Sequence, residues 1–129
     1  LKLGQPATEL SGGECQRIQL AWELQRVQRG KTLYLLDEPS TGLHPADMDK
    51  LMRVLDRLVQ RGDTVVMAEH DMRIAAEADW VLDLGPGSGE NGGRIIAAGT
   101  PEEVSRSKHS LTAPWLAARL KKRNGDPDE

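Results

Sequence analysis

Apolar positions along the chain follow two different spacings, and each spacing predicts a different kind of element. Residues 18–27 and 48–59 carry apolar side chains every three or four positions, as on one face of a helix. Residues 32–36 and 64–68 are short, continuous apolar runs, which are typical of strands buried on both faces of a parallel sheet. Helices and strands therefore alternate, which predicts an α/β fold with parallel strands flanked by helices.

Capping residues and glycines mark where the first two predicted helices begin and end. Ser11 precedes the first helix with Glu14 three positions later, the spacing of a capping box, and Gly30 can end that helix. Pro45 suits the first position of the second helix, and Gly62 follows its last turn. These signals give both helices defined limits.

The chain after the second strand predicts a short helix and then a β-hairpin. An alanine-rich segment reaches residue 78 and is expected to be helical. Strands at residues 80–84 and 94–98 flank the glycine-rich loop "GPGSGENGG". Two apolar runs joined by such a loop are typical of a hairpin.

Two further helices are predicted near the end of the chain. Residues 100–103, "TPEE", have the cap, proline and glutamate of a helix start. Residues 111–120 form a last short helix, with Trp115 packed against the domain. We expect one domain over residues 1–104, and a C-terminal helix followed by a disordered tail over residues 105–129.

Composition and charge restrict the class of protein. The 129 residues suit a single domain, and 38% hydrophobic with 29% charged residues is typical of globular proteins. The formal net charge of -3 does not favour a nucleic-acid surface, which needs clustered Lys and Arg. The single cysteine, Cys15, permits no internal disulfide and fits a cytoplasmic protein, and with three scattered histidines it does not favour a zinc site. No apolar run reaches the ~20 residues of a membrane-spanning helix.

Carboxylates and a histidine follow the two predicted parallel strands. Asp37 and Glu38 come directly after the first strand, and His70 follows the second. In α/β folds, ligands bind at the carboxyl ends of the strands. One carboxylate can hold Mg²⁺, a second can accept a proton from an attacking water, and a histidine can hydrogen-bond a phosphate. The same residues also fit an acidic surface turn and an ordinary polar strand-to-helix turn, so both interpretations stay open at this point.

A second candidate site is the start of the first helix, "SGGE" at residues 11–14. Glycines at a helix N-terminus expose backbone N–H groups and the positive end of the helix dipole, which attract phosphate. The hydroxyl of Ser11 can add a donor, although its capping-box spacing to Glu14 explains the same residues without a ligand. Residues 87–92 match G-x-G-x-x-G, but a strand follows them, so no nucleotide site is expected there.

Four motifs in a fixed order resemble those of the ABC-type ATPase domain. "LSGGE" is similar to its signature motif, "LYLLDE" to its Walker B strand with the catalytic carboxylate, "STGLH" to its D-loop and "EHD" to its switch-histidine segment. The wording of "TLYLLDEPSTGLHPAD" and "DWVLDLGPGSGENGGRIIAAGTPEEV" is most similar to the UvrA family of nucleotide excision repair proteins. The resemblance covers about residues 3–104 and implies the C-terminal part of the second ATPase domain of that family.

The resemblance implies a site for ATP and Mg²⁺ between two ATPase domains. Asp37 would hold Mg²⁺ through water, Glu38 would deprotonate the attacking water, and His70 would contact the γ-phosphate. The signature residues that would meet the γ-phosphate of a nucleotide on the partner domain are Ser11, Gly12, Gly13 and Glu14, and the D-loop residues beside it are Gly42 and His44. The Walker A motif, G-x-x-x-x-G-K-[ST], is absent from residues 1–129, so the chain resembles half of a P-loop NTPase domain and is expected to be inactive alone.

The resemblance also implies partners and leaves alternatives open. The expected partners are a second ABC domain of the same chain and a second copy of the full-length protein. DNA and a UvrB-like protein would bind through regions outside residues 1–129. The expected function of the full-length protein is an ATPase for DNA damage recognition, without membrane contact. The alternatives are a UvrA-like paralogue tied to drug tolerance, an ABC exporter ATPase, and a non-catalytic module that pairs subunits.

Overall fold

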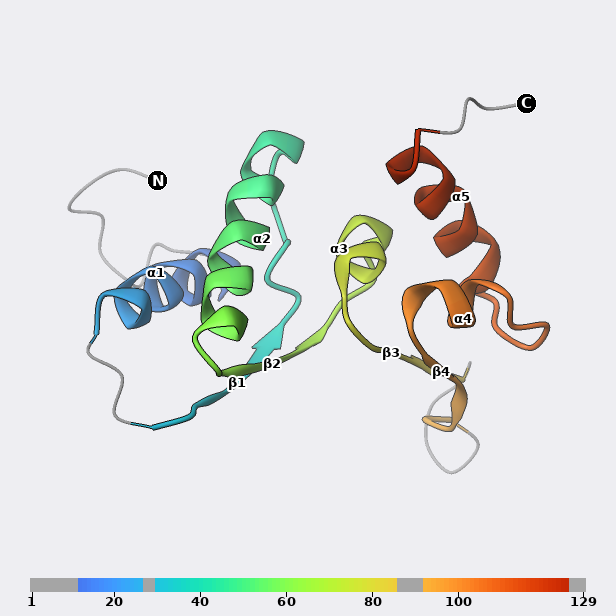
Figure 1. Ribbon diagram of the computed structural model, residues 1–129, viewed down its shortest axis with the longest axis horizontal. Coiled ribbons are helices and arrows are strands. Elements are labelled where there is room, and N and C mark those ends of the chain that lie inside the picture. Colours follow the sequence, from blue (N-terminus) through green and yellow to red (C-terminus); the bar gives the residue numbers. More distant parts are fainter. Residues whose placement is uncertain (1–11, 27–29, 86–91, 126–129) are drawn as a thin grey trace. The chain divides into compact units, whose positions relative to one another are not determined.

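The chain folds into two compact units, Leu1–His70 and Asp71–Glu129. The computed structural model describes residues 12–26, 30–85 and 92–125 (Figure 1). In the first unit two helices alternate with two strands, and the second unit holds a helix, a β-hairpin and two further helices. The predicted α/β fold with parallel strands, flanking helices and a C-terminal hairpin is therefore confirmed.

The first unit is a parallel pair of strands covered on one side by helices. Its elements are helix α1 (Gly12–Gln25), strand β1 (Leu33–Asp37), helix α2 (Pro45–Gln60) and strand β2 (Thr64–Ala68). The strands pair in parallel, with Leu33 opposite Thr64 and Asp37 opposite Ala68. Figure 1 shows α1 and α2 on the same side of these strands. The predicted capping residue Ser11 lies outside the described residues, and α1 ends at Gln25, before the predicted Gly30.

The two parallel strands bury one face only. The residues half-buried on the helix side are Tyr34, Leu36, Val65 and Met67. On the other face Leu35 is 71% exposed and Val66 is 52% exposed. The prediction that these strands are buried on both faces is wrong for this structure, because the helices of the unit cover a single side. The apolar runs in β1 and β2 are nevertheless of the kind found in strands that are buried on both faces of a sheet.

Helix α2 supplies most of the core of the first unit. Its buried residues recur at helical spacing and are Met48, Leu51, Leu55 and Leu58. Pro45 occupies the first turn as predicted. After the last turn Gly62 adopts a φ of 101° and donates its N–H to the carbonyl of Val59 at 2.9 Å. The next N–H, of Asp63, bonds to the carbonyl of Leu58 at 3.1 Å, which completes a Schellman motif.

A polar network joins the end of α1, the start of β1 and the turn after α2. The fully buried carboxylate of Asp63 accepts hydrogen bonds from the N–H of Thr32 at 2.9 Å and from Nε of Arg61 at 2.8 Å. Arg61 also donates to the carbonyl of Glu23 at 3.2 Å and to the hydroxyl of Tyr34 at 3.1 Å. The hydrogen bond to Asp63 raises the pKa of Arg61 above its ordinary value. This network sets where α1 meets β1.

The second unit is an antiparallel hairpin packed against three helices. Its elements are helix α3 (Met72–Glu77), strands β3 (Val81–Leu84) and β4 (Ile95–Gly99), and helices α4 (Pro101–Ser105) and α5 (Ala113–Arg123). Figure 1 shows the helices on one side of the hairpin. Their shared core consists of Ala76, Val104, Leu116 and Leu120. The predicted start of α4 is confirmed, because Thr100 and Glu103 form a reciprocal capping box.

The C-terminal helix differs from the predicted one. Helix α5 continues to Arg123, so residues 121–123 are helical where a disordered tail was predicted. Arg123 donates to the carbonyl of Ala76 and to Oε1 of Glu102, which holds the end of α5 against α3 and α4. Trp115, predicted to pack against the domain, is 71% exposed, because the neighbouring Leu116 occupies the core-facing position. The predicted boundary at residue 104 falls inside α4 and stays a prediction.

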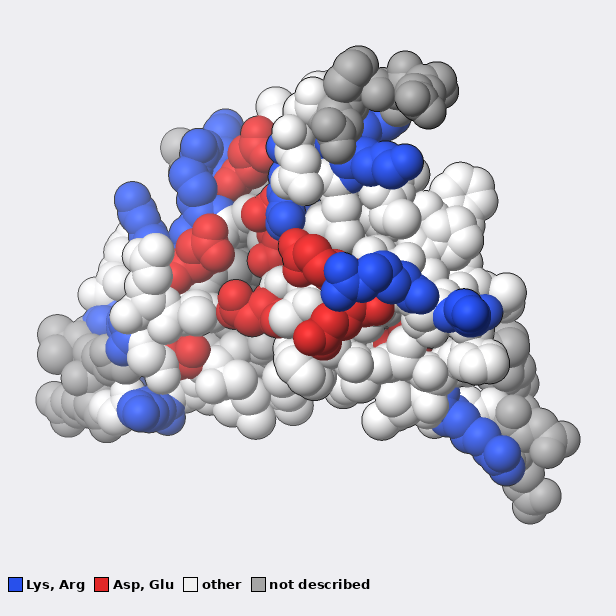
Figure 2. Space-filling model, turned by 45° about the vertical axis from the view of Figure 1, so that its right-hand side comes forward, with Lys and Arg blue, Asp and Glu red and all other residues white. Residues whose placement is uncertain are grey.

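The described surface carries charges of both signs. Figure 2 shows described side chains of both Lys and Arg and of Asp and Glu on this surface. Within the described ranges, no helix combines the length and apolar character needed to cross a membrane.

Removal of the buried carboxylate should destabilise the chain. We expect Asp63→Ala to lower the free energy of unfolding by about 1–3 kcal/mol, because the guanidinium of Arg61 and the N–H of Thr32 lose their acceptor. Urea unfolding followed by circular dichroism measures this change. The control is Asp56→Ala, which removes an exposed carboxylate from α2 and should change the free energy by less than about 0.5 kcal/mol. Equal unfolding midpoints for the two variants would contradict the structural role of the network.

Candidate active site

The carboxyl ends of the two parallel strands bring together residues that are about thirty positions apart in the chain. Asp37 is the last residue of β1 and lies opposite Ala68, the last residue of β2. The N–H of Glu38 bonds to the carbonyl of Ala68 at 2.9 Å, which extends the pairing one residue past the strand. Glu38 and His70 therefore leave the sheet at the same edge, as the sequence predicts for groups that follow parallel strands.

Glu38 and His70 are in direct contact. Nδ1 of His70 lies 3.3 Å from Oε1 of Glu38, and their side chains are 77% and 51% exposed respectively. A carboxylate only accepts hydrogen bonds, so a hydrogen bond across this contact would need a proton on Nδ1. This pair joins a potential proton acceptor, Glu38, to a side chain that can donate a hydrogen bond to a phosphate, His70, at an open edge of the sheet.

The backbone of Glu38 adopts an unusual conformation. Its φ of 44° is the only positive φ among the non-glycine residues that the structure describes. A left-handed non-glycine residue costs about 1–3 kcal/mol and persists where its surroundings hold it. The carbonyl of Glu38 accepts from the N–H of Thr41 at 3.1 Å and from its hydroxyl at 2.8 Å. The turn after β1 therefore holds the carboxylate in a direction that an extended strand would not give.

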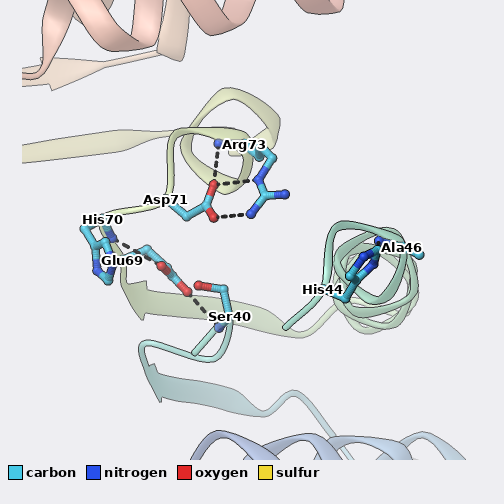
Figure 3. Close-up of polar contacts among 7 residues, drawn as sticks. All are labelled: Ser40, His44, Ala46, Glu69, His70, Asp71 and Arg73. Carbon is cyan, nitrogen blue, oxygen red and sulfur yellow. Dashed lines mark hydrogen bonds and ion pairs between the residues drawn. The ribbon is translucent and has the colours of Figure 1, made fainter. Parts of the chain in front are cut away.

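Glu69 is a residue of this edge that the sequence analysis did not assign. Its Oε1 accepts from the N–H of Ser40 at 2.9 Å and its Oε2 accepts from the N–H of His70 at 3.2 Å (Figure 3). Ser40 is buried in the turn after Glu38. One carboxylate thus ties the turn after β1 to the turn after β2. The signal for it in the sequence was an acidic residue directly before His70, which alone does not reveal a bond across the sheet.

The third residue of the "EHD" motif caps a helix. The carboxylate of Asp71 accepts from the N–H of Arg73 at 2.9 Å and forms an ion pair with its guanidinium at 2.7 Å (Figure 3). Asp71 is the N-cap of α3. Its contacts are explained by the start of that helix.

The predicted D-loop residues lie in the turn and helix start after Glu38. Gly42 has a φ of 74°, which glycine adopts without strain. His44 is the N-cap of α2, and its Nδ1 accepts from the N–H of Ala46 at 3.3 Å. Figure 3 shows His44 pointing away from Glu69 and His70. The structure thus gives His44 a capping contact, and a role for Gly42 or His44 in nucleotide binding stays a prediction.

The predicted signature segment is described from its first glycine onward. Gly12 and Gly13 form the beginning of α1, and Glu14 lies in its first turn. Ser11 and its predicted capping bond lie outside the described residues. The assignment of this segment to a phosphate on a partner domain stays a prediction.

The acidic residues of the strand edge fit a metal ion that arrives with a nucleotide. Among residues 12–26, 30–85 and 92–125, no group of three or more His, Cys, Asp or Glu could hold a metal ion by itself. Mg²⁺ in nucleotide sites takes one or two carboxylates, several waters and phosphate oxygens. The exposed carboxylate of Asp37, at the end of β1 and beside Glu38, is a donor of this kind. Asp37 is therefore compatible with Mg²⁺ that is bound partly by phosphate.

Comparisons of the sequence with known proteins identify its relatives. Residues 2–76 match the family described as "AAA domain, putative AbiEii toxin, Type IV TA system". The chain is 57% identical over 122 residues, 95% of its length, to UvrABC system protein A of Aquifex aeolicus. It is 54% identical over 129 residues, 100% of its length, to UvrABC system protein A of Mesorhizobium japonicum. In both cases the chain spans 13% of the relative's length.

A solved structure supports the same resemblance. The crystal structure of UvrA2 from Deinococcus radiodurans matches the fold with a TM-score of 0.84 and 62% sequence identity. The match covers 93% of this chain and 15% of that chain. The resemblance to the UvrA family, predicted from the motifs, is confirmed.

The link between the two turns can be tested at a single amide. Glu69→Ala should speed hydrogen exchange of the Ser40 N–H about tenfold or more, because a hydrogen bond to a charged acceptor is lost. Exchange followed by NMR on the described chain measures this rate. Glu69→Gln keeps an acceptor oxygen and should retain most of the protection, and the exposed Glu77→Ala should leave it unchanged. An unaltered Ser40 rate in Glu69→Ala would show that the bond does not protect this amide.

Proposed function

Because the chain belongs to the AAA domain family and is similar to UvrABC system protein A over nearly its whole length, we propose that it forms part of an ATP-hydrolysing domain of a UvrA-type protein. The proposed role of that protein is to couple ATP hydrolysis to DNA damage recognition in nucleotide excision repair. The observation that carries the proposal is the contact between Glu38 and His70 at the carboxyl ends of β1 and β2.

Glu38 is the proposed proton acceptor. Its side chain is exposed at the edge of the sheet, where a water has access, and its left-handed backbone directs it there. Its carboxylate takes the proton from the water that attacks the terminal phosphate, which is general base catalysis. The hydroxyl of Thr41 donates to the backbone carbonyl of Glu38, which holds the turn and with it the carboxylate in place. Catalysis thus rests on positioning.

His70 is the proposed contact to the terminal phosphate. Its Nδ1 faces Glu38, so Nε2 is the nitrogen left for a phosphate oxygen. His70 thus senses the phosphate and orients Glu38 at the same time.

The nucleotide and its metal are assigned partly to this chain and partly to another region. Bound Mg²⁺ would neutralise the charge on the transferred phosphoryl group, and Asp37 would hold it through water. Gly12 and Gly13, with Ser11 and Glu14, are proposed to contact a nucleotide on a partner domain through the amides that begin α1. The phosphate-binding loop would come from outside residues 1–129, because the sequence contains no G-x-x-x-x-G-K-[ST].

The remaining parts of the proposal concern the full-length protein. A second ATPase domain of the same chain and a second copy of the full-length protein are the proposed partners, and DNA and a UvrB-like partner are assigned to regions outside residues 1–129. The expected cytoplasmic location rests on the single cysteine and stays a prediction.

A non-catalytic module that pairs subunits is the second candidate function. The exposed face of the parallel strands favours it, since Leu33, Leu35 and Val66 are each more than half exposed. Large apolar side chains gathered on one surface are typical of interaction sites. The two candidates differ in their dependence on Glu38.

The catalytic role of Glu38 can be tested in the full-length protein. Glu38→Gln should leave ATP binding unchanged and reduce ATP hydrolysis at least about a hundredfold, because the amide cannot accept the proton. Phosphate release at saturating ATP measures turnover, and a fluorescent nucleotide measures binding. Glu77→Gln is the matched control, since Glu77 is an exposed glutamate at the end of α3. Normal turnover in Glu38→Gln would reject the proposal and favour the second candidate.

The requirement for another region can be tested with the segment alone. Residues 1–129 should show no ATP binding in the micromolar range, because the lysine and backbone amides of a phosphate-binding loop are absent. Isothermal titration calorimetry with ATP and Mg²⁺ measures this. A micromolar dissociation constant would contradict the assignment of the phosphate contacts to another region.

A further inference from the structure

The side chain of Gln16, in the first part of α1, is hydrogen-bonded to the backbone at the end of β1. Nε2 of Gln16 donates to the carbonyl of Asp37 at 2.8 Å, and Oε1 of Gln16 accepts from the N–H of Asp37 at 3.0 Å. The amide of Gln16 thus matches both polar groups of one residue, as a neighbouring strand would. The two bonds fix the position of Asp37 relative to α1.

The next residue of α1 is bonded to the other side of the same turn. Nη1 of Arg17 donates to the carbonyl of Pro39 at 2.9 Å and lies 3.4 Å from the carbonyl of Thr41. Pro39 is fully buried, so this part of the turn is firmly placed. A guanidinium donates charge-assisted hydrogen bonds, which are stronger than those between neutral groups.

The two contacts lie on either side of Glu38. Gln16 holds the residue before it and Arg17 holds the residue after it. Glu38 is the residue whose φ of 44° requires support from its surroundings. The partners are separated by 21 and 22 positions in the chain, so the support comes from packing of α1 against the turn.

We propose that Gln16 and Arg17 are positioning residues for hydrolysis, which hold the backbone of Glu38 in its left-handed conformation from the helix that begins with Gly12 and Gly13. The inference rests on the proposed function, in which Glu38 accepts the proton from water. It adds a physical connection between the start of α1 and the catalytic turn. A displacement of α1 is transmitted to Glu38 through these hydrogen bonds.

Loss of Gln16 or Arg17 should affect kcat and KM differently. Gln16 and Arg17 contact the backbone of the turn, so we expect their loss to lower kcat and to leave the KM for ATP unchanged. In the full-length protein, Gln16→Glu removes the donor to Asp37 without changing side-chain size, and Arg17→Leu removes the donor to Pro39. Each should lower kcat about tenfold or more. Arg17→Lys keeps one cationic donor and should recover part of this loss.

A double-variant cycle separates positioning from general destabilisation. If Arg17 acts only through Glu38, Arg17→Leu combined with Glu38→Gln should lose no more turnover than Glu38→Gln alone. Arg26→Leu is the matched control, because Arg26 is an exposed arginine directly after the same helix and its partners are Glu23 and Trp22. It should leave kcat unchanged. Thermal unfolding of each variant checks that the fold is intact.

The outcomes distinguish the inference from the proposed function. Normal turnover in Gln16→Glu and Arg17→Leu, beside an inactive Glu38→Gln, overturns the inference alone. Equal losses in Arg17→Leu and Arg26→Leu, or losses that add to that of Glu38→Gln, also overturn it. Normal turnover in Glu38→Gln rejects the proposed function and the inference with it. Should Arg17→Leu fail to fold, Gln16→Glu carries the same test, because it is close to isosteric.

Discussion

The parallel pairing of β1 with β2 is the interaction on which the candidate site depends. Because Asp37 lies opposite Ala68, the segments after β1 and β2 leave the sheet at the same level. The Glu38 N–H continues the pairing by its bond to the Ala68 carbonyl. A shift of one residue in this register would turn every side chain of the strand to the other face. The contact between Glu38 and His70 therefore depends first on the pairing of the strands and only then on the two side chains.

Polar contacts from outside the sheet hold both ends of β1. At its start the buried carboxylate of Asp63 binds the N–H of Thr32, and at its end Gln16 binds the backbone of Asp37. The apolar residues between these anchors face α1 and α2 on one side. The strand thus combines a position set by hydrogen bonds with an uncovered apolar face, as exposed Leu35 illustrates. A strand held in this way can pack against a further element on its exposed face without changing its own position.

Local signals in the sequence predicted most of this arrangement. The apolar runs, Pro45 and the capping box at Thr100 and Glu103 are short-range patterns, and the structure confirms the elements that they predicted. The bond from Glu69 to Ser40 joins different turns, so no spacing along the chain reveals it. The burial of the strands was predicted wrongly. An apolar run shows that a strand can be covered on both faces, but not that residues 1–129 contain the elements that cover both. Trp115 was misplaced because its neighbour Leu116 competes for the same core.

The left-handed backbone at residue 38 has a consequence for how the protein can be stabilised. On conformational grounds alone, a φ of 44° favours glycine or asparagine, and the sequence carries glutamate there. A search for more thermostable variants that scored only folding would select glycine or asparagine at this position, and either would remove the carboxylate. Under the proposed function, thermal tolerance and turnover are therefore opposed at Glu38, and improvement of the first has to be sought in other parts of the chain.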